Sequence, residues 1–158
     1  MKIYLIILLF LTASCGSNKY QKAIVKLQPA NNSKISGVVK ITQNNSGISL
    51  SGKFENLNRK HHAFHIHQYG DITKKDGSGT GPHYYKKNYR QGHNVVGNLG
   101  RIKRQGKYTE YENYIDNLTI NEIIGRSMVI HAKKGSKKSS KFVDSGKRVA
   151  TGVIGVAK

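Results

Sequence analysis

The ten residues HAFHIHQYGD, numbered 62–71, say more about the fold than any other stretch of the sequence. Residues two apart in a β-strand project from the same face, so His65 and His67 can present their imidazoles side by side while Ile66 packs on the opposite face. The stretch therefore predicts a strand with one apolar side and one histidine-bearing side. On the pattern alone, a His-x-His triplet is more often a pair of exposed or hydrogen-bonded histidines than part of a metal site.

Short runs of alternating apolar residues recur along the rest of the chain, and Gly, Asn, Ser or Lys residues bound each of them. No stretch keeps the 3.6-residue apolar period of an amphipathic helix. Many short strands predict an all-β antiparallel sandwich or barrel. Two polar segments, 70–97 and 133–147, interrupt the pattern, and long loops in a compact β domain are usually functional or disordered. The alternating runs cover residues 23–27, 48–50, 63–67, 114–120, 127–132 and 149–156.

The length and composition fit one domain with an ordinary hydrophobic core. The chain has 158 residues, of which 37% are apolar, and this leaves no room for a second domain. Lys and Arg number 27 against 8 acidic residues, which gives a net charge of +19, or +18 without residues 1–14, whose only charged residue is Lys2. A field of this sign attracts a small anion, nucleic acid or an anionic lipid surface, so it does not identify a partner by itself.

The first 14 residues have the layout of a secretory signal. One positive charge precedes an apolar run at 3–11, which is too short to span a bilayer, and small residues follow. Cys15, the only cysteine, follows a stretch that resembles a bacterial lipobox, in which the cysteine is acylated, although Thr12 stands where leucine is usual. We expect a signal peptide at 1–14, a tether at 15–21 and a domain at 22–158. The expected location is the periplasm or cell envelope, with Cys15 lipidated and membrane-anchored; an ordinary cleaved signal is the alternative.

The remaining histidines supply candidates for a metal site. His83 follows a Gly-Pro pair in a predicted loop, and His131 ends an apolar run. Imidazole is a good ligand for both copper and zinc, but His65 and His67 form a site only if other segments bring further ligands to them.

Five segments in this order resemble the copper/zinc superoxide dismutase family, and the resemblance covers about residues 21–158. It implies an eight-stranded Greek-key β-barrel, which here would carry two long functional loops. The five segments are residues 62–71, 81–83, 96–100, 123–131 and 148–157.

The resemblance also implies roles for individual residues. Arg148 matches the family's arginine beside copper that draws in the superoxide anion, and a guanidinium is always charged and offers several donors. His62 matches a structural histidine of the barrel, whereas His61 matches no functional position. His83 stands where the family's histidine bridges copper to zinc, so His83 and Arg148 are the expected catalytic residues. The implied copper ligands are His65, His67, His83 and His131.

The zinc site departs from the family's pattern. The family uses the bridging histidine, two further histidines and an aspartate. Here Asn98 occupies the aspartate position and Val95 the position of one histidine, which leaves at most His83 and His93 as usable zinc ligands; an exposed loop histidine is the alternative for His93. Asn has only a neutral carbonyl oxygen to offer, whereas structural zinc sites normally have four good ligands. We therefore expect zinc to be weakly bound or absent, as in the copper-only branch of the family.

Two further features of the family are lost, which points in the same direction. The family's disulfide would join the positions of Gly77 and Thr151, so no covalent bond ties the loop of His83 to the last predicted strand. The family's aspartate that links the two metal sites falls near Gly135, in a shortened loop.

The resemblance implies copper-dependent disproportionation of superoxide to oxygen and hydrogen peroxide outside the cytoplasm. The positive charge would speed encounter with the anionic substrate, and a specific nucleic acid partner is not expected. A non-catalytic copper carrier or buffer on the same barrel is the alternative, but it would not need Arg148. A basic envelope protein that binds anionic polymer or lipid is a third hypothesis, and it would not hold copper tightly.

Overall fold

The computed structural model describes residues 19–86, 97–135 and 145–158. Most of these residues lie in eight β-strands, and the two short helical elements are the 3₁₀ turn η1 (Ser78–Thr80) and the helix α1 (Ile120–Ile123). The strands are β1 (Lys22–Pro29), β2 (Ser36–Gln43), β3 (Gly47–Glu55), β4 (His61–His67), β5 (Asn98–Lys103), β6 (Tyr108–Asp116), β7 (Ser127–His131) and β8 (Arg148–Val156).

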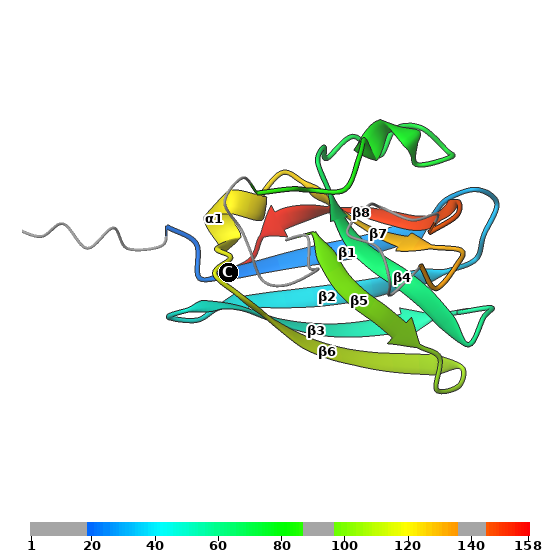
Figure 1. Ribbon diagram of the computed structural model, residues 1–158, viewed down its shortest axis with the longest axis horizontal. Helices are drawn as coiled ribbons and strands as arrows, with labels where there is room; N and C mark the ends of the chain where they lie inside the picture. The colour runs from blue at the N-terminus through cyan, green and yellow to red at the C-terminus, as the bar shows by residue number, and fades with distance from the viewer. Residues whose placement is uncertain (1–18, 87–96, 136–144) are drawn as a thin grey trace, which may run out of the picture.

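All strand pairs are antiparallel, and the strands follow one another in the order β5-β4-β7-β8-β1-β2-β3-β6. The sheet curls into a nearly closed barrel, in which β5 lies close to β6 (Figure 1). Across this gap, side chains replace the backbone ladder, because the Tyr111 hydroxyl and the Asn113 amide both donate to the carbonyl of Leu99. The expected all-β, eight-stranded barrel is confirmed.

The barrel has a first wall of β1, β2, β3 and β6 and a second wall of β5, β4, β7 and β8. Alternation of more exposed and more buried residues builds the first wall. In β1, Ala23, Val25 and Leu27 are buried, while the residues between them are exposed. One apolar face therefore covers the core and one polar face meets water, as is usual for antiparallel sheets. Three aromatic rings fill the core between the walls, with edge-to-face centroid distances of 5.5–6.1 Å: Phe54, Phe64 and Tyr111.

One predicted strand runs too far. The alternating run at 114–120 begins inside β6, but that strand ends at Asp116. Asn117 takes a positive φ of 54°, and Thr119 then forms a capping box with Glu122 that starts α1. Turn and capping chemistry thus override the apolar alternation at this point.

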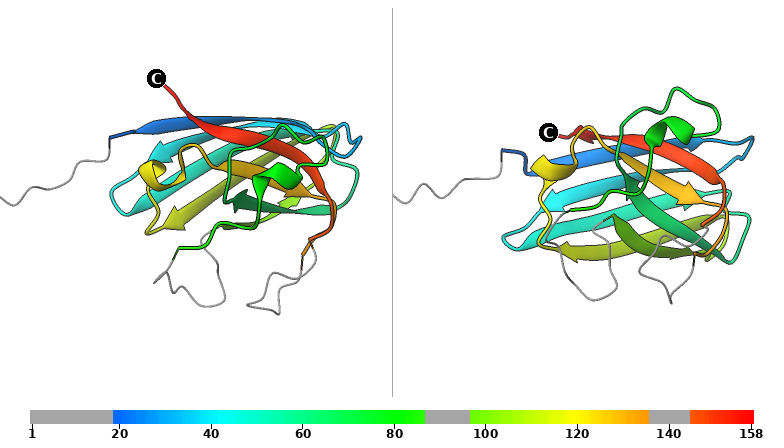
Figure 2. Two further views of the ribbon diagram at one scale, coloured as in Figure 1. Left: turned by 90° about the horizontal axis from the view of Figure 1, so that it is seen from above. Right: turned by 45° about the horizontal axis from the view of Figure 1, so that its top comes forward.

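The two long polar segments connect neighbouring strands of the second wall. Segment 70–97 lies between β4 and β5, and segment 133–147 lies between β7 and β8. The part of the first segment that contains η1 packs against β8 in both views of Figure 2. Within the described residues, no helix is both long and apolar enough to cross a membrane.

Candidate metal centre

Four histidines from three parts of the chain meet at one place. His65 and His67 come from β4, His83 from the connection after β4, and His131 from the end of β7. Each offers one ring nitrogen, and these four nitrogens lie within 4.8 Å of one another. All but His83 are buried, and His67 exposes only 1% of its surface. The convergence that the sequence left open is therefore present in the structure.

Irregular strand pairing precedes two of these histidines. The ladder between β4 and β5 shifts register between Ala63 and His65, and the ladder between β7 and β8 shifts between Ile130 and His131. Such irregularities bend a strand and change the direction of the following side chain. An isolated antiparallel bridge to His67 then places His83 beside β4.

Hydrogen bonds to the backbone fix the tautomers of two rings. The Nδ1–H of His67 donates to the carbonyl of Gly81 at 2.8 Å, and the Nδ1–H of His131 donates to that of Gly146 at 3.2 Å. A carbonyl oxygen can only accept, so in each neutral ring Nε2 carries the lone pair. The two Nε2 atoms lie 3.1 Å apart, and their lone pairs repel unless a proton or a cation lies between them.

A third ring has an unsatisfied atom at the same place. The Nδ1 of His65 is buried and has no hydrogen-bond partner. Buried polar atoms are rarely left without a partner, and a metal ion bound at this nitrogen would satisfy it. Because the cluster consists of imidazoles without a carboxylate, its donor set fits copper.

The environment keeps all four rings neutral. Burial, followed by the neighbouring histidines, lowers the pKa of His65 to about 2. Burial is also the main cause that lowers the pKa of His67 to about 3 and those of His83 and His131 to about 4. The nearby Arg148 guanidinium contributes to the last three shifts. A neutral imidazole is the form that binds a metal.

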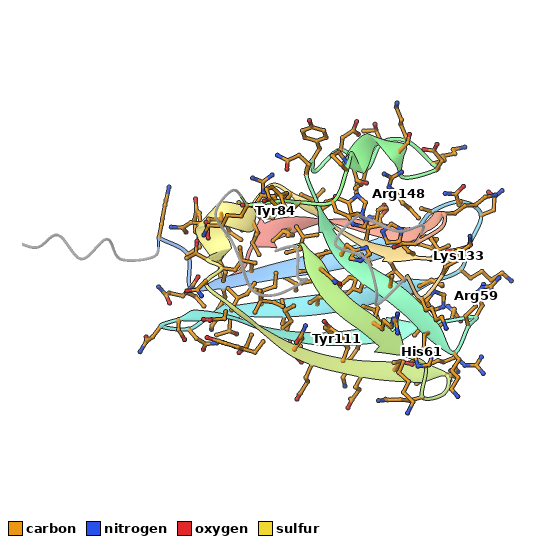
Figure 3. All side chains as sticks on the ribbon, viewed as in Figure 1. Arg59, His61, Tyr84, Tyr111, Lys133 and Arg148 are labelled. Carbon is orange, nitrogen blue, oxygen red and sulfur yellow. The ribbon has the colours of Figure 1, made fainter. Side chains whose placement is uncertain are left out.

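Arg148 opens β8 and lies beside the cluster, next to the segment that contains η1 (Figure 3). Its Nη2 donates to the carbonyl of Gly81 at 2.8 Å, while its Nε is buried without a partner. The same carbonyl accepts from His67, so one backbone oxygen orients both side chains. Gly81 has φ 69° and ψ −158°, and a Cβ there would lie 2.4 Å from the Tyr69 ring, so only glycine suits this position.

The two other histidines of β4 lie apart from the cluster of four histidines. His62 is fully buried, and its Nδ1–H donates to the carbonyl of His131 at 2.7 Å, so it joins β4 to β7 behind the cluster. His61 begins β4 at the far end of the strand (Figure 3).

Of the predicted zinc residues, Asn98 is exposed at the start of β5. Its side-chain oxygen, the atom that it would offer to zinc, accepts a hydrogen bond from the backbone N–H of Gly100 at 2.9 Å. His93 and Val95 lie outside the described residues, as does Cys15.

The two positions of the family's disulfide face each other in this structure. A Cβ on Gly77 would lie 3.0 Å from Cγ2 of Thr151. The loop thus lies against β8 through van der Waals contact at this point and through the hydrogen bond from Arg148 to Gly81, without a covalent bond.

Sequence reasoning missed the backbone acceptors that orient His67, His131 and Arg148. The carbonyls of Gly81 and Gly146 carry no sequence signal for this role, since every residue has a carbonyl. Only the Gly-Pro pair before His83 marked the loop as special.

The chain is similar to known proteins over most of its length. A family profile described as copper/zinc superoxide dismutase (SODC) matches residues 35–154. A superoxide dismutase (Cu-Zn) of Onchocerca volvulus is 34% identical over 142 residues, which cover 77% of this chain and 89% of that protein. The corresponding protein of Schizosaccharomyces pombe is 39% identical over 146 residues, or 79% and 92% of the two chains. An extracellular superoxide dismutase (Cu-Zn) of Brugia pahangi is 33% identical over 146 residues, or 81% and 73%.

The chain is also similar to a solved structure. The crystal structure of the clock protein EA4 superposes with a TM-score of 0.74 at 28% identity, and the alignment covers 90% of this chain and 98% of that one. By its sequence matches, its barrel and its clustered histidines, this chain is an oxidoreductase of the copper/zinc superoxide dismutase family.

Proposed function

We propose that the chain disproportionates superoxide to oxygen and hydrogen peroxide with one copper ion held by His65, His67, His83 and His131. The observation that carries this proposal is the convergence of four neutral imidazoles within 4.8 Å beside the guanidinium of Arg148. Copper bound there would supply the one-electron redox chemistry that the side chains lack, because it has two accessible oxidation states.

Arg148 binds and orients the substrate in this proposal. Its Nη2 is fixed by the carbonyl of Gly81, and the rest of the guanidinium keeps a permanent positive charge beside the cluster.

His83 is the residue best placed to hold and pass a proton. It is the least buried ring of the four, and burial together with Arg148 lowers its pKa to about 4. This low pKa keeps the ring neutral near pH 7, so a proton that the ring took up during turnover would be held weakly and given readily to a more basic acceptor such as peroxide.

We further propose that the chain works in the copper-only form. The neutral side chain at Asn98 supports this, because its oxygen already accepts from Gly100, and Val95 has no ligand atom at all. The two remaining candidates, His83 and His93, are too few for a normal structural zinc site.

An exported, lipid-anchored form is the third part of the proposal. The apolar run at 3–11 and the lone Cys15 support a signal peptide at 1–14, a tether at 15–21 and a domain at 22–158. The extracellular relative of Brugia pahangi supports export. In the cell envelope, the net positive charge would attract the anionic substrate and make turnover fall as ionic strength rises.

Metal analysis after loading with both ions tests the proposal most directly. We expect one copper and no zinc per chain, together with superoxide loss by the loaded protein. One zinc per chain at a site that survives removal of copper would overturn the copper-only form. Tight copper without any superoxide loss would instead favour a copper carrier on the same barrel.

A further inference from the structure

Residues 68–86, called here the segment of His83, need contacts that hold them in position. The segment leaves β4 after His67 and returns with His83 facing His65, at a ring-centroid distance of 3.9 Å. Cys15 is the only cysteine, so no internal disulfide can tie this segment to the barrel. A functional side chain has to be fixed to within about 0.5 Å to keep a productive geometry, and contacts elsewhere have to supply that constraint.

Arg126, between α1 and β7, contacts both ends of this segment. Its Nη1 donates to the carbonyl of Gln68 at 2.9 Å, where the segment begins. Its guanidinium carbon lies 3.9 Å from the ring centroid of Tyr84, where the segment returns. Its Nε donates to the carbonyl of Glu122 at 2.9 Å, which fixes the guanidinium to α1. The half-buried Arg126 thus connects Gln68, Tyr84 and α1.

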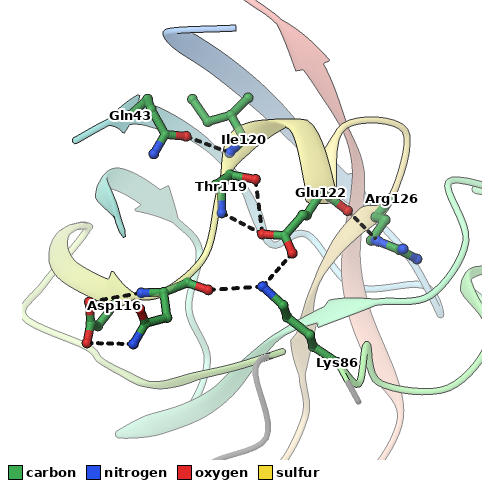
Figure 4. A network of polar contacts seen from close by, with 8 residues as sticks. Gln43, Lys86, Asp116, Thr119, Ile120, Glu122 and Arg126 are labelled. Atoms are coloured by element: carbon green, nitrogen blue, oxygen red, sulfur yellow. Dashed lines mark hydrogen bonds and ion pairs between the residues drawn. The ribbon is translucent and has the colours of Figure 1, made fainter. Parts of the chain in front are cut away.

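A second contact holds the end of the segment to the same helix (Figure 4). The Nζ of Lys86 lies 2.5 Å from Oε1 of Glu122 and also donates to the carbonyl of Asn117 at 3.3 Å. The other carboxylate oxygen of Glu122 accepts from the backbone and the hydroxyl of Thr119. The side chains of Lys86 and Glu122 are each about one-third exposed. The hydrogen bonds from Thr119 hold the carboxylate in the position where Lys86 contacts it.

Backbone hydrogen bonds on either side of His83 connect these contacts to its position. The N–H of Tyr84 donates to the carbonyl of Ile66, and the N–H of Gln68 donates to that of Pro82, both at 2.8 Å. Residues 82–84 therefore run alongside the end of β4 as an added piece of strand. Neighbouring side chains of an extended segment point to opposite sides. With Tyr84 packed in the core and covered by Arg126, the ring of His83 has to point toward the histidine cluster.

We propose that Arg126, supported by Glu122 and Lys86, is a positioning residue that holds the segment of His83 against β4 in place of a covalent tie. The proposal rests on the proposed function, since it assigns a purpose to the position of His83. Arg126 acts through Gln68 and Tyr84 and contacts neither the substrate nor the four histidines.

Amide hydrogen exchange of the metal-free protein tests this hold without any use of activity. In Arg126→Gln we expect the amides of Gln68 and Tyr84 to exchange about tenfold faster or more, since loss of bonds to a charged donor favours local opening. The amides in the ladder between β2 and β3 should keep their rates, which shows that the barrel itself is folded. The matched control is Arg104→Gln, because Arg104 also donates to a backbone carbonyl, that of Leu57, but at the opposite end of the barrel.

The copper-loaded protein gives the second measurement. In Arg126→Gln the electron paramagnetic resonance spectrum of the cupric form should change, because one imidazole is held less firmly, and Arg126→Lys should restore part of the native signal by keeping a cation over Tyr84. Lys86→Met should produce a smaller change in the same amides. Unchanged exchange at Gln68 and Tyr84, or a native spectrum in Arg126→Gln, would overturn the positioning role. A native chain that binds no copper would instead overturn the proposed function and leave the exchange result standing.

Discussion

The two walls of the barrel are built differently. The wall of β1, β2, β3 and β6 keeps one continuous register from strand to strand, and none of its strands contains a histidine. The wall of β5, β4, β7 and β8 shifts register twice, and both shifts lie directly before a histidine of the cluster. Long connections also join the strands of the second wall, whereas short turns join those of the first.

This difference indicates that the two walls have different roles. A regular ladder buries its apolar face efficiently and satisfies every backbone group, so the first wall supplies stability. An irregular strand turns a side chain out of the alternation, and the second wall uses this to bring rings from separate segments together. If the walls differ in this way, substitutions in the second wall should change copper binding, and substitutions in the first wall should change the free energy of unfolding.

The largest expected effect belongs to His131→Ala in the second wall. Removing one of four ligands should lower copper affinity and superoxide loss by about 100-fold or more, since even groups that only support a ligand are worth 10- to 100-fold. The unfolding free energy of the metal-free protein should fall by less than in a truncation of the apolar core. Copper titration, superoxide loss and urea unfolding measure the three quantities. Native copper affinity in this variant would remove His131 from the site.

Phe54→Ala in the first wall should give the opposite result. Phe54 is fully buried and packs edge-to-face on Phe64 and Tyr111, so truncation should cost about 3–5 kcal/mol of stability. At a temperature where the variant is folded, its cupric spectrum should stay native. The exposed neighbour Lys53 is the control, and Lys53→Ala should change urea unfolding by less than about 0.5 kcal/mol. A changed spectrum in Phe54→Ala would show that the walls are not independent.

Arg148→Gln separates binding of the metal from binding of the substrate within the second wall. Superoxide loss should fall by about tenfold, which corresponds to about 1.4 kcal/mol, because a fixed charge is lost while all four imidazoles remain. Copper stoichiometry should stay at one per chain. Equal superoxide loss by the variant and the native protein would assign Arg148 a structural role only.

The pH dependence of stability also belongs to the second wall. Burial lowers the pKa of His65, His67, His83 and His131, so in acid the unfolded chain binds more protons than the folded one. The stability that these neutral rings contribute is fully present above about pH 6.5 and is lost as the pH falls, down to about pH 4 for His83 and His131 and to about pH 2–3 for His65 and His67.

Urea unfolding of the metal-free protein should therefore give a free energy at least about 1 kcal/mol lower at pH 5 than at pH 7.5. His131→Ala should show a shallower dependence, because it has one fewer buried ring. A slope that His131→Ala leaves unchanged would place the titrating groups outside the cluster.

Most of the strands could be predicted from the sequence because alternation reports directly on burial. The runs at 23–27 and 149–156 lie within β1 and β8, and the pair His65 and His67 lies on one strand as expected. The prediction was wrong where local chemistry opposed the apolar pattern, as at Asn117 and the cap of α1. Alternation carries no information about caps.

The sequence by itself determined the residues of the site and the sign of its field, since His, Arg and Lys carry that chemistry wherever the chain places them. Their separation along the chain, from His65 to Arg148, left open whether they would meet. Only the tertiary structure decided this, because strand register and loop return are set by long-range packing that no local pattern records. The tertiary structure also selected the carbonyl of Gly81 to orient His67 and Arg148, and Arg126 to hold the segment of His83. A backbone oxygen and one basic residue among many gain a specific role only from what lies beside them.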